Sequence, residues 1–140
     1  MVLRAEHARA TLDEGEELGI APGAPVYHLD RIRLLGGVPI AVDVTVVVGA
    51  LAQLDAVDFA TASLFDALGG VGLEPTRADS TIEARAADAA TADRLGLDER
   101  DPVLVMRQVA LDADERPLLA STITYAGDRY RLRTSSARHR

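Results

Sequence analysis

The sequence contains no cysteine, and all of its basic side chains are arginines because no lysine occurs. The absence of cysteine excludes disulfide bonds, thiolate zinc sites and cysteine nucleophiles. Three histidines (His7, His28 and His139) are too few and too scattered to indicate a metal site. No apolar run reaches membrane length, and the first ten residues lack the apolar core of a signal peptide. We therefore expect a cytoplasmic protein with no metal, no cofactor and no membrane partner.

The size and charge of the chain indicate a single domain and disfavour one class of function. Its 140 residues, of which 48% are hydrophobic and 26% charged, correspond to one globular domain. Asp and Glu number 22 against 15 Arg, which gives a net charge of -7. An acidic chain is not expected to bind nucleic acid by itself, because basic side chains must neutralise the phosphates.

Alternation of apolar residues and turn signals predict a mixed α/β domain. Thr11 and Glu14 have the spacing of a capping box, and Gly19 is a typical helix stop. The apolar spacing of Phe65 and Leu68 predicts the buried face of a short helix. The expected strands are 2–6, 26–35, 39–48, 79–86, 103–112, 118–125 and 129–133, and the expected helices are 11–18, 60–68 and 88–95.

The register of the first hairpin decides which side chains meet. A three-residue loop at 36–38 places Arg31 opposite Asp43 and Arg33 opposite Ala41. We prefer it to a two-residue loop, because it gathers the polar groups on one face. The opposite face of the second strand, rich in Ile and Val, is then expected to be buried.

Two stretches of the chain, starting at Leu18 and Leu95, resemble each other. Both contain a helix end, a turn, a strand, a hairpin and a second strand, which indicates an internal duplication. Some charges occur in one copy alone: Arg31, Arg33 and Asp43 correspond to Gln108, Ala110 and Ser121. Two arginines beside a carboxylate can bind a small anion. The alternative is a solvent-exposed face with an ordinary ion pair.

These motifs resemble a known family, the UTRA domain, which is the C-terminal effector-binding domain of HutC-type GntR transcription regulators. The resemblance covers nearly the whole chain and is carried by LGIAPGAPVYHLDRIRLLGGVPIAVD, SLFDALGGVG, ADRLGLDERDPVLVMRQVALDADERPLL and YAGDRYRLR. It implies a chorismate-lyase-like α+β fold, with a central, mainly antiparallel sheet, flanking helices and a metabolite pocket. It also implies a homodimer.

The resemblance assigns roles to individual residues. Arg31 and Arg33 match the family's R-x-R in the effector pocket, and Asp43 stands where many members have a ligand-contacting Glu. Ser63 matches a pocket serine, and Tyr125 matches a tyrosine near the ligand.

Several features depart from the pattern or stay open. Leu119 replaces a Glu that often recognises amino-sugar phosphates, so we expect a smaller or more apolar effector with an anionic end. Glu83 either lines the pocket or lies on a solvated face. His28 is expected to be a satisfied core or interface histidine.

The resemblance sets the domain bounds and the function. It places the effector domain at 1–133, without the first part of the usual domain, and a frayed tail at 134–140. It implies that operator DNA is bound only by a winged-helix domain that precedes it in full-length regulators. The expected function is metabolite sensing without catalysis and without catalytic residues. Two alternatives are a chorismate-lyase-like enzyme and a dimerisation module with a vestigial pocket.

Overall fold

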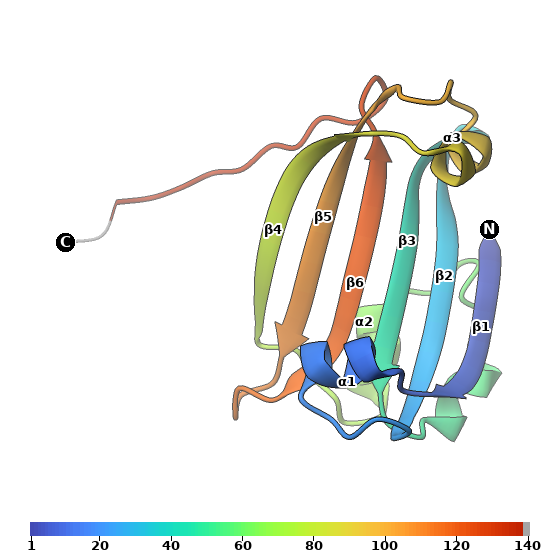
Figure 1. Cartoon of the computed structure of the whole chain (residues 1–140). Helices are drawn as coiled ribbons and strands as arrows, with labels where there is room; N and C mark the ends of the chain where they lie inside the picture. The colour runs from blue at the N-terminus through green and yellow to red at the C-terminus, as the bar shows by residue number, and fades with distance from the viewer. Residues whose placement is uncertain (139–140) are drawn as a thin grey trace.

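The computed structural model describes residues 1–138, which form one antiparallel sheet with short helices on both faces (Figure 1). His139 and the end of the predicted 134–140 tail lie outside the described residues. The elements are β1 (Val2–Arg9), α1 (Leu12–Leu18), β2 (Pro25–Leu35), β3 (Val38–Val48), the 3-10 helix η1 (Ala52–Ala56), α2 (Leu64–Gly70), β4 (Arg77–Ala86), α3 (Ala89–Leu95), β5 (Pro102–Leu111) and β6 (Pro117–Ala126). The predicted α+β class with a mainly antiparallel sheet is confirmed.

The internal duplication is visible in the strand order, which is β1-β2-β3-β6-β5-β4. Each half contains a strand, a helix and a hairpin: β1, α1, β2 and β3 in the first, and β4, α3, β5 and β6 in the second. The halves join where β3 pairs with β6, from Ala41 opposite Tyr125 to Val47 opposite Leu119. We call this β3–β6 pairing the seam.

Local signals set the helix ends. Thr11 caps α1 in a complete capping box with Glu14, as predicted, and Gly19 ends this helix in the left-handed conformation. The prediction of a helix at 60–68 is wrong at its start, because Ser63 is the N-cap and α2 begins at Leu64. The preceding residues form a turn on Asp58, whose side chain accepts a hydrogen bond from the backbone N–H of Ala60.

The prediction of a strand at 129–133 is wrong. After β6 the chain turns at residues 127–129, and the Arg129 side chain is bound to other parts of the fold. Its guanidinium donates to the backbone oxygens of Pro39, Leu95 and Gly96 at 3.0, 2.6 and 3.3 Å. These bonds tie the turn to the start of β3 and to the end of α3. Beyond them, the segment pairs with no strand edge in the described residues.

The first hairpin has the predicted pairing but a different turn. Arg31 lies opposite Asp43 and Arg33 opposite Ala41. Leu35 pairs directly with Val38, so the turn is the two-residue Gly36-Gly37, and a bulge in β3 shifts the register. Both glycines have positive φ, which suits a tight hairpin turn. The bulge, rather than a longer loop, gathers the polar groups on one face.

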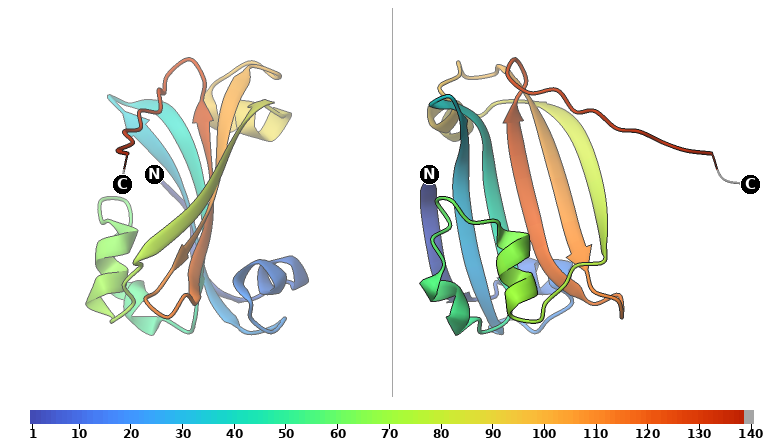
Figure 2. Two further views of the ribbon diagram at one scale, coloured as in Figure 1. Left: turned by 90° about the vertical axis from the view of Figure 1, so that its left-hand side faces the viewer. Right: turned by 180° about the vertical axis from the view of Figure 1, so that it is seen from behind.

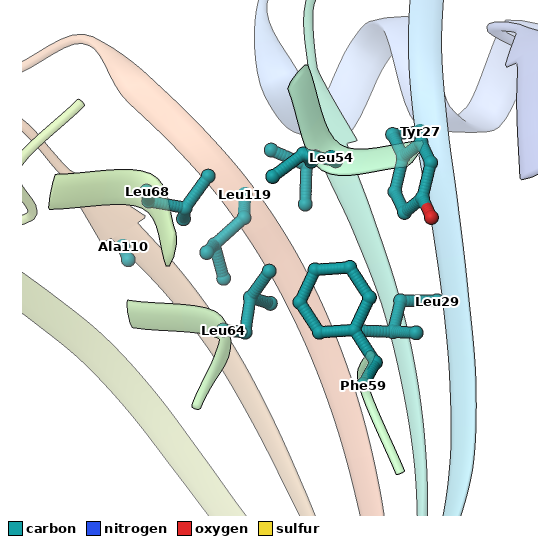
Figure 3. Packing of buried hydrophobic residues seen from close by; sticks show 9 residues of the cluster. Tyr27, Leu29, Leu54, Phe59, Leu64, Leu68, Ala110 and Leu119 are labelled. Carbon is teal, nitrogen blue, oxygen red and sulfur yellow. The ribbon is translucent and has the colours of Figure 1, made fainter. Parts of the chain in front are cut away.

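The two faces of the sheet are covered unequally. Helices α2 and η1 lie over one face, whereas α1 and α3 lie at opposite ends of the other (Figure 2). The largest core cluster is under α2 and η1 (Figure 3), and it comprises Tyr27, Leu29, Val47, Leu54, Phe59, Leu64, Leu68, Ala110 and Leu119. The expectation that the Ile/Val row of β3 is buried is only partly right. Val42 is buried, but Val44, Val46 and Val48 are half-buried.

Candidate functional site

A cavity of about 240 Å³ lies between the start of α2 and the centre of the sheet. It crosses the seam, because strands β2, β3, β6 and β5 all contribute to its floor. Its polar lining consists of Arg31, Arg33, Asp43, Thr45, Ser63, Gln108, Ser121 and Tyr125. Its apolar lining consists of Leu64, Phe65, Met106, Leu119 and Ile123. Five of the six residues singled out in the sequence are thus brought together.

The Asp43 carboxylate faces both arginines. Its Oδ2 atom lies 3.3 Å from Nη2 of Arg33 and 3.8 Å from Nη2 of Arg31. Asp43 is 4% exposed, whereas the Arg33 side chain is 49% exposed. One carboxylate against two guanidinium groups leaves an excess of one positive charge. Among the described residues, the Arg33 side chain donates only to Asp43, so most of its five donors remain for a ligand.

A hydroxyl chain holds the other oxygen of Asp43. Thr45 donates to Asp43 Oδ1 at 2.8 Å, and its Oγ1 lies 2.8 Å from Ser121 Oγ. A hydroxyl has one hydrogen, so Ser121 is the donor in the second bond. Both carboxylate oxygens of Asp43 therefore have partners before any ligand binds, and the carboxylate is fixed in position.

Arg31 connects the site to the segment before α2. Its Nη1 donates to the backbone oxygen of Ala62 at 3.2 Å. Burial lowers the pKa of Arg31, Asp43 opposes this shift and Arg33 reinforces it, but an arginine keeps its charge in proteins. Arg31 and Arg33 also line an adjoining hollow of about 530 Å³, which extends toward Met1 and Phe59. The arginine pair thus lines both spaces.

Ser63, the N-cap of α2, and Phe65, in its first turn, face the cavity in different ways. Ser63 accepts the cap hydrogen bond from the backbone N–H of Asp66 at 3.4 Å, and its own hydroxyl proton remains available to a ligand. Leu68 is fully buried, as predicted, but the prediction that Phe65 is a core residue is wrong. Phe65 is 48% exposed at the cavity edge, because Leu64 and Leu68, four residues apart, form the buried face of α2.

Tyr125 closes the end of the site beside the turn after β6. Its ring stacks on that of Tyr130, with 3.9 Å between centroids and 18° between planes. Burial, and then the neighbouring Tyr130, raise the pKa of the Tyr125 hydroxyl. The hydroxyl therefore stays protonated at neutral pH and can donate a hydrogen bond.

Glu83 does not reach the cavity. It lies opposite Val105 on β5, so it points to the other face of the sheet from Ile82 and ion-pairs with Arg85 at 2.9 Å. The structure places it on the solvated face that the sequence left open as an alternative. His28 is buried 3.3 Å from the Glu14 carboxylate, which fits the satisfied histidine expected.

Sequence reasoning missed Thr45, Gln108 and Ser121 as lining residues. The internal duplication could have predicted two of these three lining residues. Gln108 is the counterpart of Arg31 and Ser121 that of Asp43, and the seam brings the counterparts together around one cavity. Leu119, which the sequence marked as a departure from the family pattern, lines the same cavity.

The chemistry of the cavity suits a small molecule with one anionic end. The arginines can bind a carboxylate or phosphate with paired hydrogen bonds. The hydroxyl and amide groups can orient a polar portion, and the leucine, methionine and isoleucine side chains can cover an apolar portion. Within residues 1–138, no group of three or more His, Cys, Asp or Glu residues could hold a metal ion. In the same range, no helix is long and apolar enough to cross a membrane.

The comparisons with known proteins agree with this description. The family model of the UTRA domain matches residues 1–131. The chain is 32% identical over 115 residues to the HTH-type transcriptional regulator GgaR of Escherichia coli, covering 82% of this chain and 46% of that one. It is 31% identical over 117 residues to the HTH-type transcriptional repressor PhnF of Mycolicibacterium smegmatis, covering 80% and 46%. The chain thus spans about half the length of these relatives.

A solved structure has the same fold. The crystal structure of a putative transcriptional regulator from Streptomyces coelicolor superposes with a TM-score of 0.86 at 30% identity. The match covers 94% of this chain and 87% of that chain. The strand order and the helix positions are therefore shared with that regulator over nearly the whole chain.

Proposed function

The chain belongs to the UTRA domain family, the effector-binding domains of GntR-family transcription regulators, and we propose that it binds a small anionic metabolite in the cavity beside α2. The observation that carries the proposal is the Arg31–Arg33–Asp43 group. It combines an excess positive charge, a buried and fully partnered carboxylate, and donors that face a space of about 240 Å³. Ser63 and Tyr125 supply further donors.

The proposed effector is a carboxylic acid or phosphate ester that is smaller or more apolar than an amino-sugar phosphate. Leu119 lines the cavity and offers no acceptor for a sugar hydroxyl or an amide. The volume of about 240 Å³ lies below the range of sites for drug-sized ligands. These two features favour a compact anion with an apolar body.

Binding acts on the whole regulator by population shift. The domain occupies residues 1–133 and forms a homodimer, and a winged-helix domain of the whole regulator binds operator DNA in the cytoplasm. An effector that prefers one dimer geometry favours it by the difference between its two binding free energies. The change in geometry is passed to the DNA-binding domains.

A thermal-shift screen tests the effector site. Sugar phosphates, amino acids, urocanate-like acids and chorismate are added to the wild type and to the variant carrying both Arg31→Ala and Arg33→Ala. A ligand at 100 times its dissociation constant stabilises the folded state by about 2.7 kcal/mol. Arg107→Ala, on the opposite face of the sheet, is the matched control. A shift that disappears only in the double variant supports the proposal, and an equal shift in all three proteins contradicts it.

Catalysis is the competing function for this fold, and the relatives argue against it because they are transcription regulators. Incubation with chorismate separates the two readings. The sensor leaves chorismate unchanged. Release of pyruvate, abolished by Arg33→Ala, would instead establish a lyase.

A further inference from the structure

Strand β4 is an unusually open edge of the sheet. All ten of its residues are exposed, and within residues 1–138 it pairs only with β5. Its pairing runs from Arg77 to Ala86 without a shift in register. Ile82, near its centre, is 47% exposed. A long, regular edge with an exposed apolar residue is a ready template for another strand.

The opposite edge of the sheet, β1, is also largely exposed but less regular than β4. In β1 the register shifts between Val2 and Arg4, and such irregularities discourage pairing with another chain. The η1 segment also reaches this edge, where Asp55 binds His7 at 2.7 Å. The two halves of the duplication therefore differ at their outer strands.

The charges of β4 are self-complementary in one antiparallel register. When Ile82 lies opposite Ile82 of a second copy, Asp79 lies opposite the partner's Arg85, and this pair occurs twice. A register moved by one residue on each strand, centred on Thr81, sets Arg77 against Arg85 and Asp79 against Glu83. Like charges directly opposite each other destabilise a strand pair, and opposite charges stabilise it.

We propose that β4 pairs antiparallel with β4 of a second copy about a two-fold axis at Ile82, which joins the two sheets edge to edge. This inference specifies the surface for the homodimer of the proposed function. The same residue meets its own counterpart, as a closed two-fold interface requires. The charge pairs fix the register, and the Ile82 pair supplies apolar contact at the centre.

The proposed interface lies next to the effector cavity. Ile82 is in register with Met106, which lines the cavity. Ser80 accepts a hydrogen bond from Gln108, another lining residue, at 3.1 Å. A ligand that displaces Met106 or Gln108 therefore acts directly on the strand that forms the interface.

Charge reversal with mixing tests the interface. Sedimentation velocity over a range of concentrations is run on the wild type, Asp79→Arg, Arg85→Asp and the double variant. Each single reversal sets like charges opposite each other twice, so its dimer dissociation constant rises about tenfold or more. The double variant restores both pairs and dimerises like the wild type. An equimolar mixture of the two single variants forms heterodimers, because both of their cross pairs are opposite in charge.

Two controls make the result decisive. Glu17→Arg, on the exposed surface of α1, makes the same change in net charge as Asp79→Arg and leaves the dimer unchanged. Circular dichroism verifies that each variant is folded. A monomeric wild type, or single variants that dimerise like the wild type, would overturn the proposal. Neither outcome affects the thermal-shift test of the effector cavity, so the two proposals can fail separately.

Discussion

The hydroxyl of Ser121 donates to the hydroxyl of Thr45 across the seam, with 2.8 Å between the two oxygens. Thr45 in turn donates a hydrogen bond to Asp43, so the second half of the duplication supports the carboxylate of the first half. The two hydroxyls are among the few buried polar side chains of the chain. The order of donation, from Ser121 to Thr45 and from Thr45 to Asp43, predicts that Thr45 contributes more to stability than Ser121.

Thr45→Val is expected to destabilise the fold more than Ser121→Ala. Valine has nearly the same shape but leaves a buried oxygen of Asp43 without its donor, which costs about 1–3 kcal/mol. In Ser121→Ala the bond from Thr45 to Asp43 remains. Urea denaturation at neutral pH gives both free energies of unfolding, with Thr45→Ser as the conservative control. Equal losses of unfolding free energy in Thr45→Val and Ser121→Ala would contradict the inferred order of donation, from Ser121 to Thr45 to Asp43.

Arg33→Ala is expected to weaken an anionic effector by about 1.5–3 kcal/mol, the value of a lost charged hydrogen bond. Stability changes little, because half of the side chain is exposed and its pair with Asp43 is screened by water. Calorimetric titration uses the anionic compound that stabilises the wild type most in the screen. Arg33→Lys retains the charge without the planar fork and is expected to bind with intermediate affinity. Equal losses of stability and affinity would contradict a role in the pocket.

Gly15→Ala and Gly70→Ala are expected to change stability in opposite directions. A Cβ on Gly15 would lie 2.7 Å from the backbone oxygen of Ile20, so α1 or the turn after it must move. A clash of this kind costs about 1–3 kcal/mol. A Cβ on Gly70 meets nothing within 4 Å, and the loss of chain entropy in the unfolded state stabilises by about 0.5 kcal/mol. Thermal unfolding measures the stability of both variants. Changes of the same sign in Gly15→Ala and Gly70→Ala would refute the prediction.

Asp30→Asn is expected to stabilise the fold near neutral pH. Within residues 1–138, Oδ1 of Asp30 is buried without a hydrogen-bond partner, and this burial raises the pKa of the carboxyl above 3.8. An acid whose pKa is raised on folding favours the folded state when protonated, and this contribution is lost as the pH rises through the folded-state pKa. The amide stays neutral and avoids that loss.

The pH dependence distinguishes this effect from altered packing. The advantage of Asp30→Asn decreases as the pH falls through the raised pKa toward 3.8, because the wild-type carboxyl is then neutral as well. Unfolding free energies are compared at several pH values, with Glu16→Gln on the exposed side of α1 as the control. A constant difference across that range would assign the gain to packing.

Local signals in the sequence predicted the fold well where they act over a few residues. The capping box of Thr11, the helix stop at Gly19 and the pairing of Arg31 with Asp43 were all predicted correctly. The turn type was not, because a bulge in β3 and a longer loop produce the same pairing. The strand expected at 129–133 failed because a strand needs a neighbouring edge, which residue alternation cannot reveal.

The candidate site depended on contacts that no local pattern contains. The resemblance placed five side chains at the cavity, but the role of Thr45 follows only from the way β3 meets β6. Phe65 was assigned to the core because it stands three residues before Leu68, but the buried face of α2 is formed by Leu64 and Leu68 instead. The burial of the Ile/Val row was overestimated because two short helices cover only the ends of that face.

The cavity that crosses the seam has a consequence for the divergence of such domains. The strands that line it hold their register through backbone pairing and through apolar contacts elsewhere in the sheet. A side chain such as Gln108, which is half-buried and lies outside the core clusters, can therefore be exchanged with little effect on strand pairing. Because each half contributes its own residues, the proposed effector site allows substitutions in one half to alter ligand preference while the other half retains the proposed anion-binding arginines. A lineage of these sensors can thus acquire a new chemical signal in single steps, each of which leaves a foldable protein.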